Sequence, residues 1–128
     1  MNRLTSRLRI AELVFLVAVG GFVGAVLRHA FSLALPGLAG TFTPNVLGCL
    51  ALGVLVYEAE LLGAVTEEAR IAAGTGFLSS FTTYSTFALE TVQSAPAVAV
   101  AYVVASYGTG FAAVLIGRAG ARRLAGGV

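Results

Sequence analysis

The stretch that decides the fold of this chain is SSFTTYST, residues 79–86, in which every residue except Phe81 carries a hydroxyl group. It lies in the middle of an apolar segment, residues 69–92, that is long enough to span a membrane. A lone serine or threonine in such a helix normally donates to a carbonyl one turn earlier and indicates little. Seven hydroxyls in eight positions exceed that background. Because broken membrane helices occur where the backbone lines a cavity or binds an ion, the stretch predicts a helix interrupted at mid-membrane.

The composition around this stretch indicates an integral membrane protein. Of the 128 residues, 58% are hydrophobic and 11% are charged. A domain this small exposes a large fraction of its surface, so lipid must cover much of the apolar part. We therefore expect an all-α integral membrane fold, a single four-helix transmembrane domain over residues 1–128. Its spans are expected at residues 10–35, 42–62, 69–92 and 96–116.

Two local features refine these spans. The first span is longer than the apolar region of a signal peptide and lacks a small-residue cleavage site, so we expect it to be retained. Thr41 is a plausible N-cap of the second span, which places Pro44 in the first turn, where it costs no helical hydrogen bond.

The arginines predict the orientation of the chain. It has eight arginines and no lysine, and the arginines form no stripe suited to nucleic acid. Seven of them lie before the first span, between the second and third spans, or after the fourth, which is one side of a four-span protein: Arg3, Arg7, Arg9, Arg70, Arg118, Arg122 and Arg123. The loops on the other side contain none. The positive-inside rule therefore places both termini of this multi-pass cell-membrane protein in the cytoplasm.

The polar groups inside the spans are mostly hydrogen-bond donors. Asn45 offers two donors and an acceptor, either for a ligand or for an interhelical hydrogen bond, and the residues leave both open. Arg28, late in the first span, either faces a water-filled cavity or reaches the headgroups. No acidic residue lies at the centre of a span. Donors without carboxylates suit an anion.

Each of the four expected spans contains a sequence motif. The motifs are GxxGAxxR at residues 21–28, GTxxxNxxG at 40–48, GFxxxFTTYSTFxxE at 76–90 and YxxxS at 102–106. With them the chain resembles the small fluoride channels, called Fluc or CrcB proteins, over nearly its whole length. The string TTYSTF after the asparagine motif is the most specific part. Tyr84 stands where that family usually has phenylalanine, and Ser79-Ser80 where it usually has two glycines.

The resemblance implies a fluoride-selective channel, not an enzyme, that passively exports fluoride from the cytoplasm and so prevents fluoride toxicity. It implies an antiparallel dimer with two pores, each lined by both subunits. A structural sodium ion at the dimer centre would be bound by the backbone carbonyls of Ser79 and Thr82. Arg28 would draw anions into a vestibule.

The resemblance also implies the residues that line the pore. Asn45 would donate its amide to fluoride, while Tyr84 and Phe87 would present the positive edges of their rings. A track of hydroxyls would come from Thr41, Ser85 and Thr86, and the fourth span would add Tyr102 and Ser106.

Two other classes of protein fit the size of the chain. A small four-helix multidrug or cation exporter also pairs antiparallel, but it needs a membrane-embedded carboxylate and typically tryptophan, and this chain has no tryptophan. A non-transporting assembly subunit would leave the hydroxyl stretch and Asn45 without a purpose.

The arginine bias also bears on the dimer partner. A chain that inserts in both orientations should show little bias, so we hypothesise a partner that is an oppositely oriented homologous chain. A dimer of the chain with itself also stays open, because acidic residues on the arginine-rich side could weaken the orienting effect of the arginines. These residues are Glu58, Glu60, Glu67 and Glu68.

Overall fold

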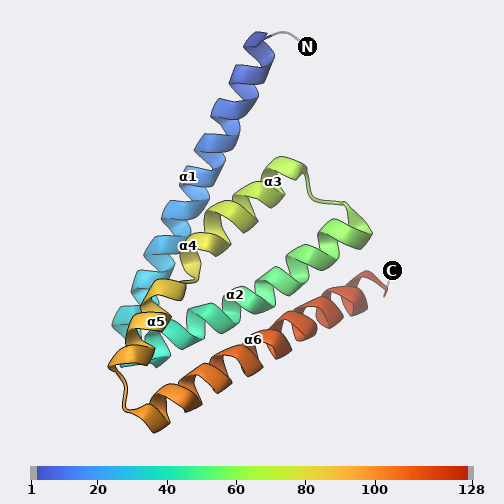
Figure 1. The fold of residues 1–128 in the computed structure, drawn as a ribbon. Helices are drawn as coiled ribbons and strands as arrows, with labels where there is room; N and C mark the ends of the chain where they lie inside the picture. The colour runs from blue at the N-terminus through green and yellow to red at the C-terminus, as the bar shows by residue number, and fades with distance from the viewer. Residues whose placement is uncertain (1–2, 127–128) are drawn as a thin grey trace.

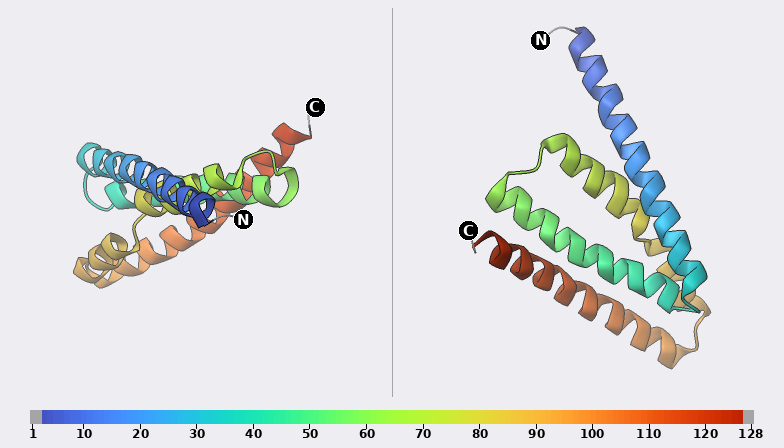
Figure 2. Two further views of the ribbon diagram at one scale, coloured as in Figure 1. Left: turned by 90° about the horizontal axis from the view of Figure 1, so that it is seen from above. Right: turned by 180° about the vertical axis from the view of Figure 1, so that it is seen from behind.

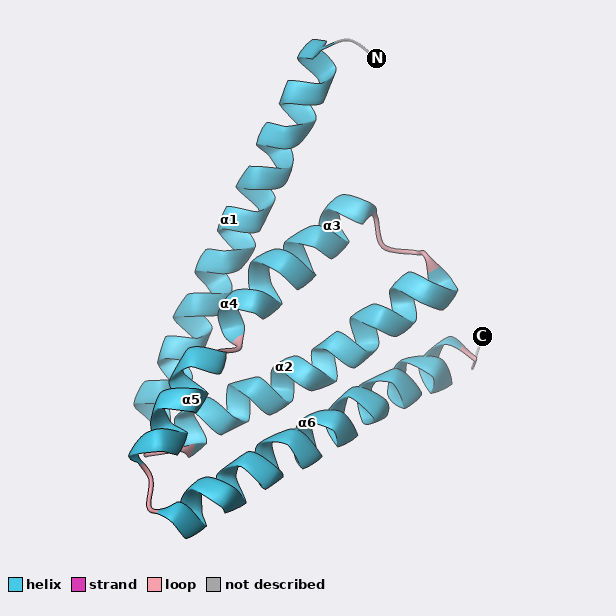
Figure 3. Cartoon of the chain, viewed as in Figure 1, coloured by secondary structure: helices cyan, strands magenta, loops and turns pink. Residues whose placement is uncertain are grey.

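A computed structural model describes residues 3–126 of the chain, which are helical apart from short connections (Figures 1 and 3). No strand occurs within these residues, so the expected all-helical fold is confirmed. η1 and η2 are π-helical stretches, which have wider turns than the α-helix. The elements, in chain order, are α1 (Arg3–Ala34), α2 (Ala39–Tyr57), η1 (Glu58–Leu62), α3 (Glu67–Ile71), η2 (Ala72–Leu78), α4 (Ser79–Phe81), α5 (Tyr84–Gln93) and α6 (Pro96–Ala125).

Three helical segments are long and apolar enough to cross a membrane: Ser6–Ala34, Ala39–Glu60 and Pro96–Ala125. They coincide with the first, second and fourth predicted spans. The predicted third span, residues 69–92, is instead divided among α3, η2, α4 and α5. Its helical backbone is interrupted at Thr82 and Thr83, which are both extended.

The helices α1 and α6 run further than the predicted spans. With 32 and 30 residues, they are about 48 and 45 Å long, against a hydrocarbon core of about 30 Å. The additional residues lie at the two ends that contain arginine, where the chain stays helical after the apolar pattern has stopped. Hydropathy reports how much of a helix lipid can cover, so it underestimates helices that continue beyond the lipid.

The helices form two pairs that are close together at one end of the molecule and separate toward the other (Figures 1 and 2). The segment α3–η2–α4 lies along α1, and α6 lies along α2. The pairs meet near the α1–α2 connection and diverge toward the other end, where both ends of the described chain and the η1–α3 connection lie. This arrangement puts the arginine-rich segments at one end of the molecule.

Both pairs are held by glycines that bring backbones together. A Cβ atom at Gly24 of α1 would overlap the carbonyl oxygen of Phe77 in η2. A Cβ atom at Gly117 of α6 would likewise overlap the carbonyl oxygen of Leu50 in α2. Close backbone approach of this kind is the usual means of helix association in lipid.

The chain leaves much apolar surface uncovered. Its accessible surface is 8380 Å², whereas a compact soluble protein of 13.0 kDa exposes about 6,300 Å². Large apolar side chains are exposed along α1 and α6, among them Phe15, Phe22, Phe111 and Leu115. Lipid or another subunit must cover these side chains.

The start of α2 differs from the prediction. The helix begins at Ala39, so Thr41 lies inside the first turn and is not its N-cap. The hydroxyl of Thr41 donates to Glu90 in α5 instead of capping α2. Pro44 consequently falls in the second turn, where its missing N–H leaves the carbonyl of Gly40 without the usual helical donor.

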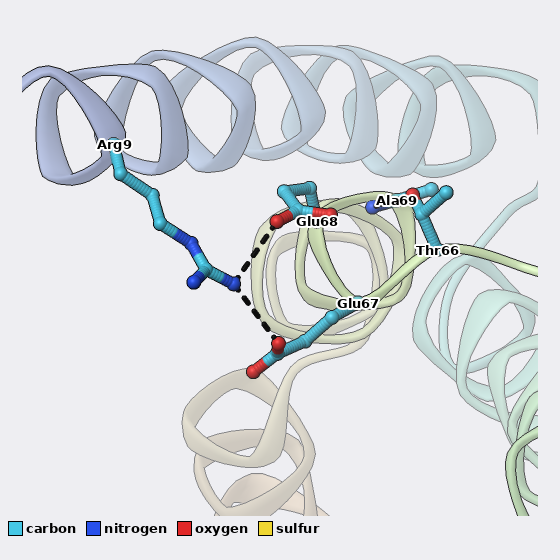
Figure 4. A network of polar contacts seen from close by, with 5 residues as sticks. All are labelled: Arg9, Thr66, Glu67, Glu68 and Ala69. Atoms are coloured by element: carbon cyan, nitrogen blue, oxygen red, sulfur yellow. Dashed lines mark hydrogen bonds and ion pairs between the residues drawn. The ribbon is translucent and has the colours of Figure 1, made fainter. Parts of the chain in front are cut away.

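Ion pairs connect the helices at the arginine-rich end. Arg9 of α1 contacts both Glu67 and Glu68 at the start of α3, each at 3.1 Å (Figure 4). Thr66 caps α3 by accepting a hydrogen bond from the N–H of Ala69. Two further pairs, Arg70–Glu58 at 3.6 Å and Arg118–Glu60 at 3.5 Å, link η1 to α3 and to α6.

Candidate functional site

The centre of the candidate site is the interruption between α4 and α5. Thr82 (φ −89°, ψ 159°) and Thr83 (φ −147°, ψ 125°) are extended. Thr82 closes the preceding helix, because its N–H and its hydroxyl both donate to the carbonyl of Leu78, at 3.0 and 2.9 Å. Thr83 begins the next one, because its Oγ1 accepts from the N–H of Thr86 at 3.3 Å. The threonine hydroxyls therefore satisfy backbone groups on both sides of the interruption.

Asn45 approaches the interruption from α2. Its Nδ2 donates to the carbonyl of Thr83 at 2.9 Å, and its Oδ1 accepts from the N–H of Thr83 at 2.8 Å. The side chain is partly buried and lines a groove described below. The second hydrogen on Nδ2 is available for another acceptor.

Arg28 approaches from α1, on the other side of the interruption. Its Nε donates to the carbonyl of Ser80 at 3.0 Å, and its side chain is partly buried. The guanidinium thereby occupies the C-terminal end of the helix that stops at Phe81. A cation is favoured there, because the last carbonyls of a helix carry partial negative charge.

The carbonyls of Ser79 and Thr82 are outside the helical hydrogen-bond pattern. The N–H of Thr83, the usual helical partner of the Ser79 carbonyl, donates to Asn45. The N–H of Thr86, the corresponding partner of the Thr82 carbonyl, donates to Thr83 Oγ1. Free carbonyl oxygens are suitable ligands for a hard monovalent cation, so these two residues fit the cation site predicted for them.

A groove of about 570 Å³ runs beside the interruption, lined by residues of α2, η2, α4, α5 and α6. Its wall is mostly apolar, and none of the described residues that line it is charged. Six predicted site residues line it: Asn45, Ser79, Thr82, Tyr84, Phe87 and Ser106. The Oγ of Ser106 is buried and has no hydrogen-bond partner among the described residues.

Aromatic rings cluster at the groove, with Phe87 at their centre. Its ring lies 5.8 Å from that of Tyr84, 5.1 Å from that of Tyr102 and 6.1 Å from that of Tyr107, measured between centroids. The Tyr107 ring is nearly perpendicular to the Phe87 ring, at 83°. Phe111 continues the series along α6. Sequence reasoning did not single out Tyr107 and Phe111, although both follow Tyr102 on α6.

Glu90 is the other residue that sequence reasoning left without a role. Its carboxylate accepts from the hydroxyl of Thr41 and from that of Tyr102, each at 2.8 Å. It therefore joins α2, α5 and α6 close to Phe87. Glu90 ends the motif at residues 76–90, three residues after Phe87, so it shares a helical face with that ring.

The predicted track of hydroxyls is divided in two. Thr41 and Tyr102 meet at Glu90, and neither lines the groove. Ser85 and Thr86 lie at the start of α5, where their hydroxyls are 3.3 and 3.1 Å from that of Thr83. Among the described residues, no hydrogen bond joins the two groups.

The chain matches a known family of proteins over most of its length. The profile of the family described as CrcB-like protein, Camphor Resistance (CrcB), matches residues 15–118. The chain is 57% identical to fluoride-specific ion channel FluC 1 of Haloarcula marismortui over 116 residues, which cover 91% of each chain. It is 52% identical to FluC 1 of Natronomonas pharaonis over 82% of this chain and 90% of the relative. It is also 52% identical to FluC 2 of Halobacterium salinarum, over 81% and 82%.

Proposed function

This chain belongs to the CrcB family and is a fluoride-specific ion channel, and we propose how it conducts. Fluoride leaves the cytoplasm passively along the groove lined by α2, η2, α4, α5 and α6. Ion channels are not a class of enzyme. Passive export of fluoride would protect the cell from fluoride toxicity.

The observation that carries this proposal is the chemistry of the groove. Its uncharged wall contains the amide of Asn45 and the buried hydroxyl of Ser106, which has no partner among the described residues. The N-terminal end of α5, which carries partial positive charge, begins at Tyr84 on the same wall. Fluoride is small and strongly hydrated, so a pore must replace its water with converging donors.

The pore residues are proposed as follows. Asn45 donates its remaining Nδ2 hydrogen to fluoride, and Ser106 donates its hydroxyl. Tyr84 and Phe87 present ring edges, which carry the positive part of the aromatic quadrupole. The hydroxyls that continue the path on either side are those of Thr41, Ser85, Thr86 and Tyr102. Arg28, beside the interruption, attracts anions toward the entrance.

An antiparallel dimer would complete the pore. In one chain the groove is open, with Tyr84 72% exposed and Phe111 69% exposed. A second subunit across this face would cover these rings and supply the opposite wall. The free carbonyls of Ser79 and Thr82 would then hold a structural sodium ion at the dimer centre, at the mid-membrane interruption. The positive charge of that ion would offset the cost of bringing anions to mid-membrane depth.

The proposed location is the cell membrane, with both termini of this chain in the cytoplasm. Seven arginines on one side support that orientation. The partner is either an identical chain or an oppositely oriented homologue. Under the positive-inside rule, a strongly biased chain favours the homologue.

Fluoride efflux from proteoliposomes, read with a fluoride electrode, tests the proposal. We expect rapid release of fluoride from liposomes that contain the purified channel, with no release of chloride. A proton-coupled exporter would instead move organic cations and would depend on a pH gradient. Equal release of the two halides, or no release of fluoride, would contradict the proposed function.

A further inference from the structure

We propose that Asn45 is a positioning residue, whose amide fixes the interruption between α4 and α5 by selecting the extended backbone of Thr83. The two hydrogen bonds, at 2.9 and 2.8 Å, connect residues that are 38 positions apart in the chain. They tie α2 directly to the point where the helix stops. This role is separate from donation of a hydrogen bond to fluoride.

The shape of the amide explains why it makes both bonds to one residue. A primary amide carries a donor and an acceptor side by side. An extended residue points its N–H and its C=O to the same side, as it does when it exchanges both bonds with the residue opposite in an antiparallel sheet. A helical residue points them in opposite directions along the helix axis. Asn45 can therefore satisfy both ends of its amide only if Thr83 is extended, as observed.

Close packing holds the amide within reach of Thr83. Gly48, three residues after Asn45 on α2, leaves the space that the methyl group of Thr82 occupies, because a Cβ atom at Gly48 would overlap that methyl carbon. Pro44, the residue before Asn45, is fully buried. The backbone of α2 is thus in direct contact with the interruption at Gly48, close to Asn45.

The pair of bonds has two consequences for the site. By occupying the N–H of Thr83, Asn45 leaves the carbonyl of Ser79 free. By holding Thr83 extended, it places Thr83 Oγ1 to cap α5 at Thr86, and α5 then starts with Tyr84 beside the groove. The effect on transport rests on the proposed function, but the pair of bonds itself does not require fluoride.

Amide hydrogen exchange in sodium-containing, fluoride-free buffer tests this role, on the full-length channel labelled with ¹⁵N-threonine and ¹⁵N-tyrosine. In the wild type, the amide of Thr83 should exchange at least about tenfold more slowly than that of Tyr84, which begins α5 and has no acceptor in its own helix. Equal exchange of the two amides would overturn the proposal. This comparison needs no variant and therefore stands even if a variant fails to fold.

Asn45→Leu, which removes both bonds at similar volume, gives the second measurement. Exchange at Thr83 should rise about tenfold or more, in line with the loss of a partly buried hydrogen bond. The matched control is Thr41→Val, one turn earlier on the same helix, which removes a proposed pore hydroxyl and should leave exchange at Thr83 unchanged. An Asn45→Leu protein with wild-type exchange at Thr83 would show that Asn45 does not position the interruption. Because no fluoride is present, this result is independent of whether the channel conducts fluoride.

Discussion

Replacing Asn45 by aspartate should abolish fluoride flux while leaving a folded protein. In the structure, Asn45 Nδ2 lies 2.9 Å from the carbonyl oxygen of Thr83. Aspartate puts an oxygen in that position, so a donor that faces one carbonyl and a passing anion becomes a negatively charged acceptor. The bond from the N–H of Thr83, at 2.8 Å, can persist, because the other carboxylate oxygen still accepts it.

The size of the effect follows from Coulomb's law. Two unit negative charges about 4 Å apart repel by about 4 kcal/mol at an effective dielectric constant of about 20. If the barrier to permeation rises by that amount, the rate falls about a thousandfold, since about 1.4 kcal/mol corresponds to a factor of ten. Loss of the donated hydrogen bond adds about 1 kcal/mol. We therefore expect a reduction in flux of at least about a thousandfold.

The assay is efflux from liposomes at matched protein density, after size-exclusion chromatography has shown that the variant elutes as the wild type does. Asn45→Leu is the matched control, because it removes the donor without adding a charge. Asn45→Leu also loses the bond from the N–H of Thr83, which Asn45→Asp can keep. Flux that falls less in Asn45→Leu than in Asn45→Asp would therefore show that the added charge costs more than the loss of that bond. Wild-type flux from a well-folded Asn45→Asp protein would refute the placement of Asn45 in the pore.

Four further predictions test the pore, the cation site, the packing and the topology. Phe87→Ile keeps apolar bulk but removes the ring edge, so efflux should fall sharply while the dimer persists; unchanged efflux would make Phe87 a packing residue only. Thr82→Ala should disturb sodium binding, followed by ²³Na NMR, less than Thr82→Pro, which also removes the N–H donated to Leu78; equal effects would argue against backbone ligands. Gly24→Val should lower the melting temperature, at a cost of about 1–3 kcal/mol or more, because its side chain meets the Phe77 carbonyl; an unchanged melting temperature would show that α1 and η2 can separate freely. A C-terminal topology reporter on the chain expressed alone should be wholly cytoplasmic, with fluoride flux only when an oppositely oriented homologue is added; a mixture of orientations with full flux would identify a dual-topology homodimer.

The parts of the fold that the sequence predicts well are those set by lipid. The positions of α1, α2 and α6 follow from runs of apolar residues, because burial in a bilayer depends on distance along one axis. The density of hydroxyl groups at residues 79–86 likewise indicated where the third span is interrupted. Which residues of that segment are extended was not predictable, because the contact between Thr83 and Asn45 joins positions far apart in the chain and is set by tertiary packing.

The site was predictable to a similar degree. The motifs indicated residues that the structure brings to one groove, including Asn45, Phe87 and Ser106. They did not reveal that Thr41 and Tyr102 meet at Glu90, since that contact joins three helices. Nor did they indicate that Arg28 donates to a backbone carbonyl, because a guanidinium late in a span fits a vestibule, a lipid headgroup or a helix end equally well.

The spacing of Asn45 and Thr83 also constrains how the chain is made. During synthesis α2 emerges before Thr83, which lies 38 residues further on, and before α6, along which α2 packs. A ribosome adds about 5–20 residues per second, so Thr83 is synthesised several seconds after Asn45. During that time, lipid, the translocon or a chaperone must contact the Asn45 amide and the glycine-lined face of α2. The channel can therefore close around its own groove only after most of the polypeptide has been inserted.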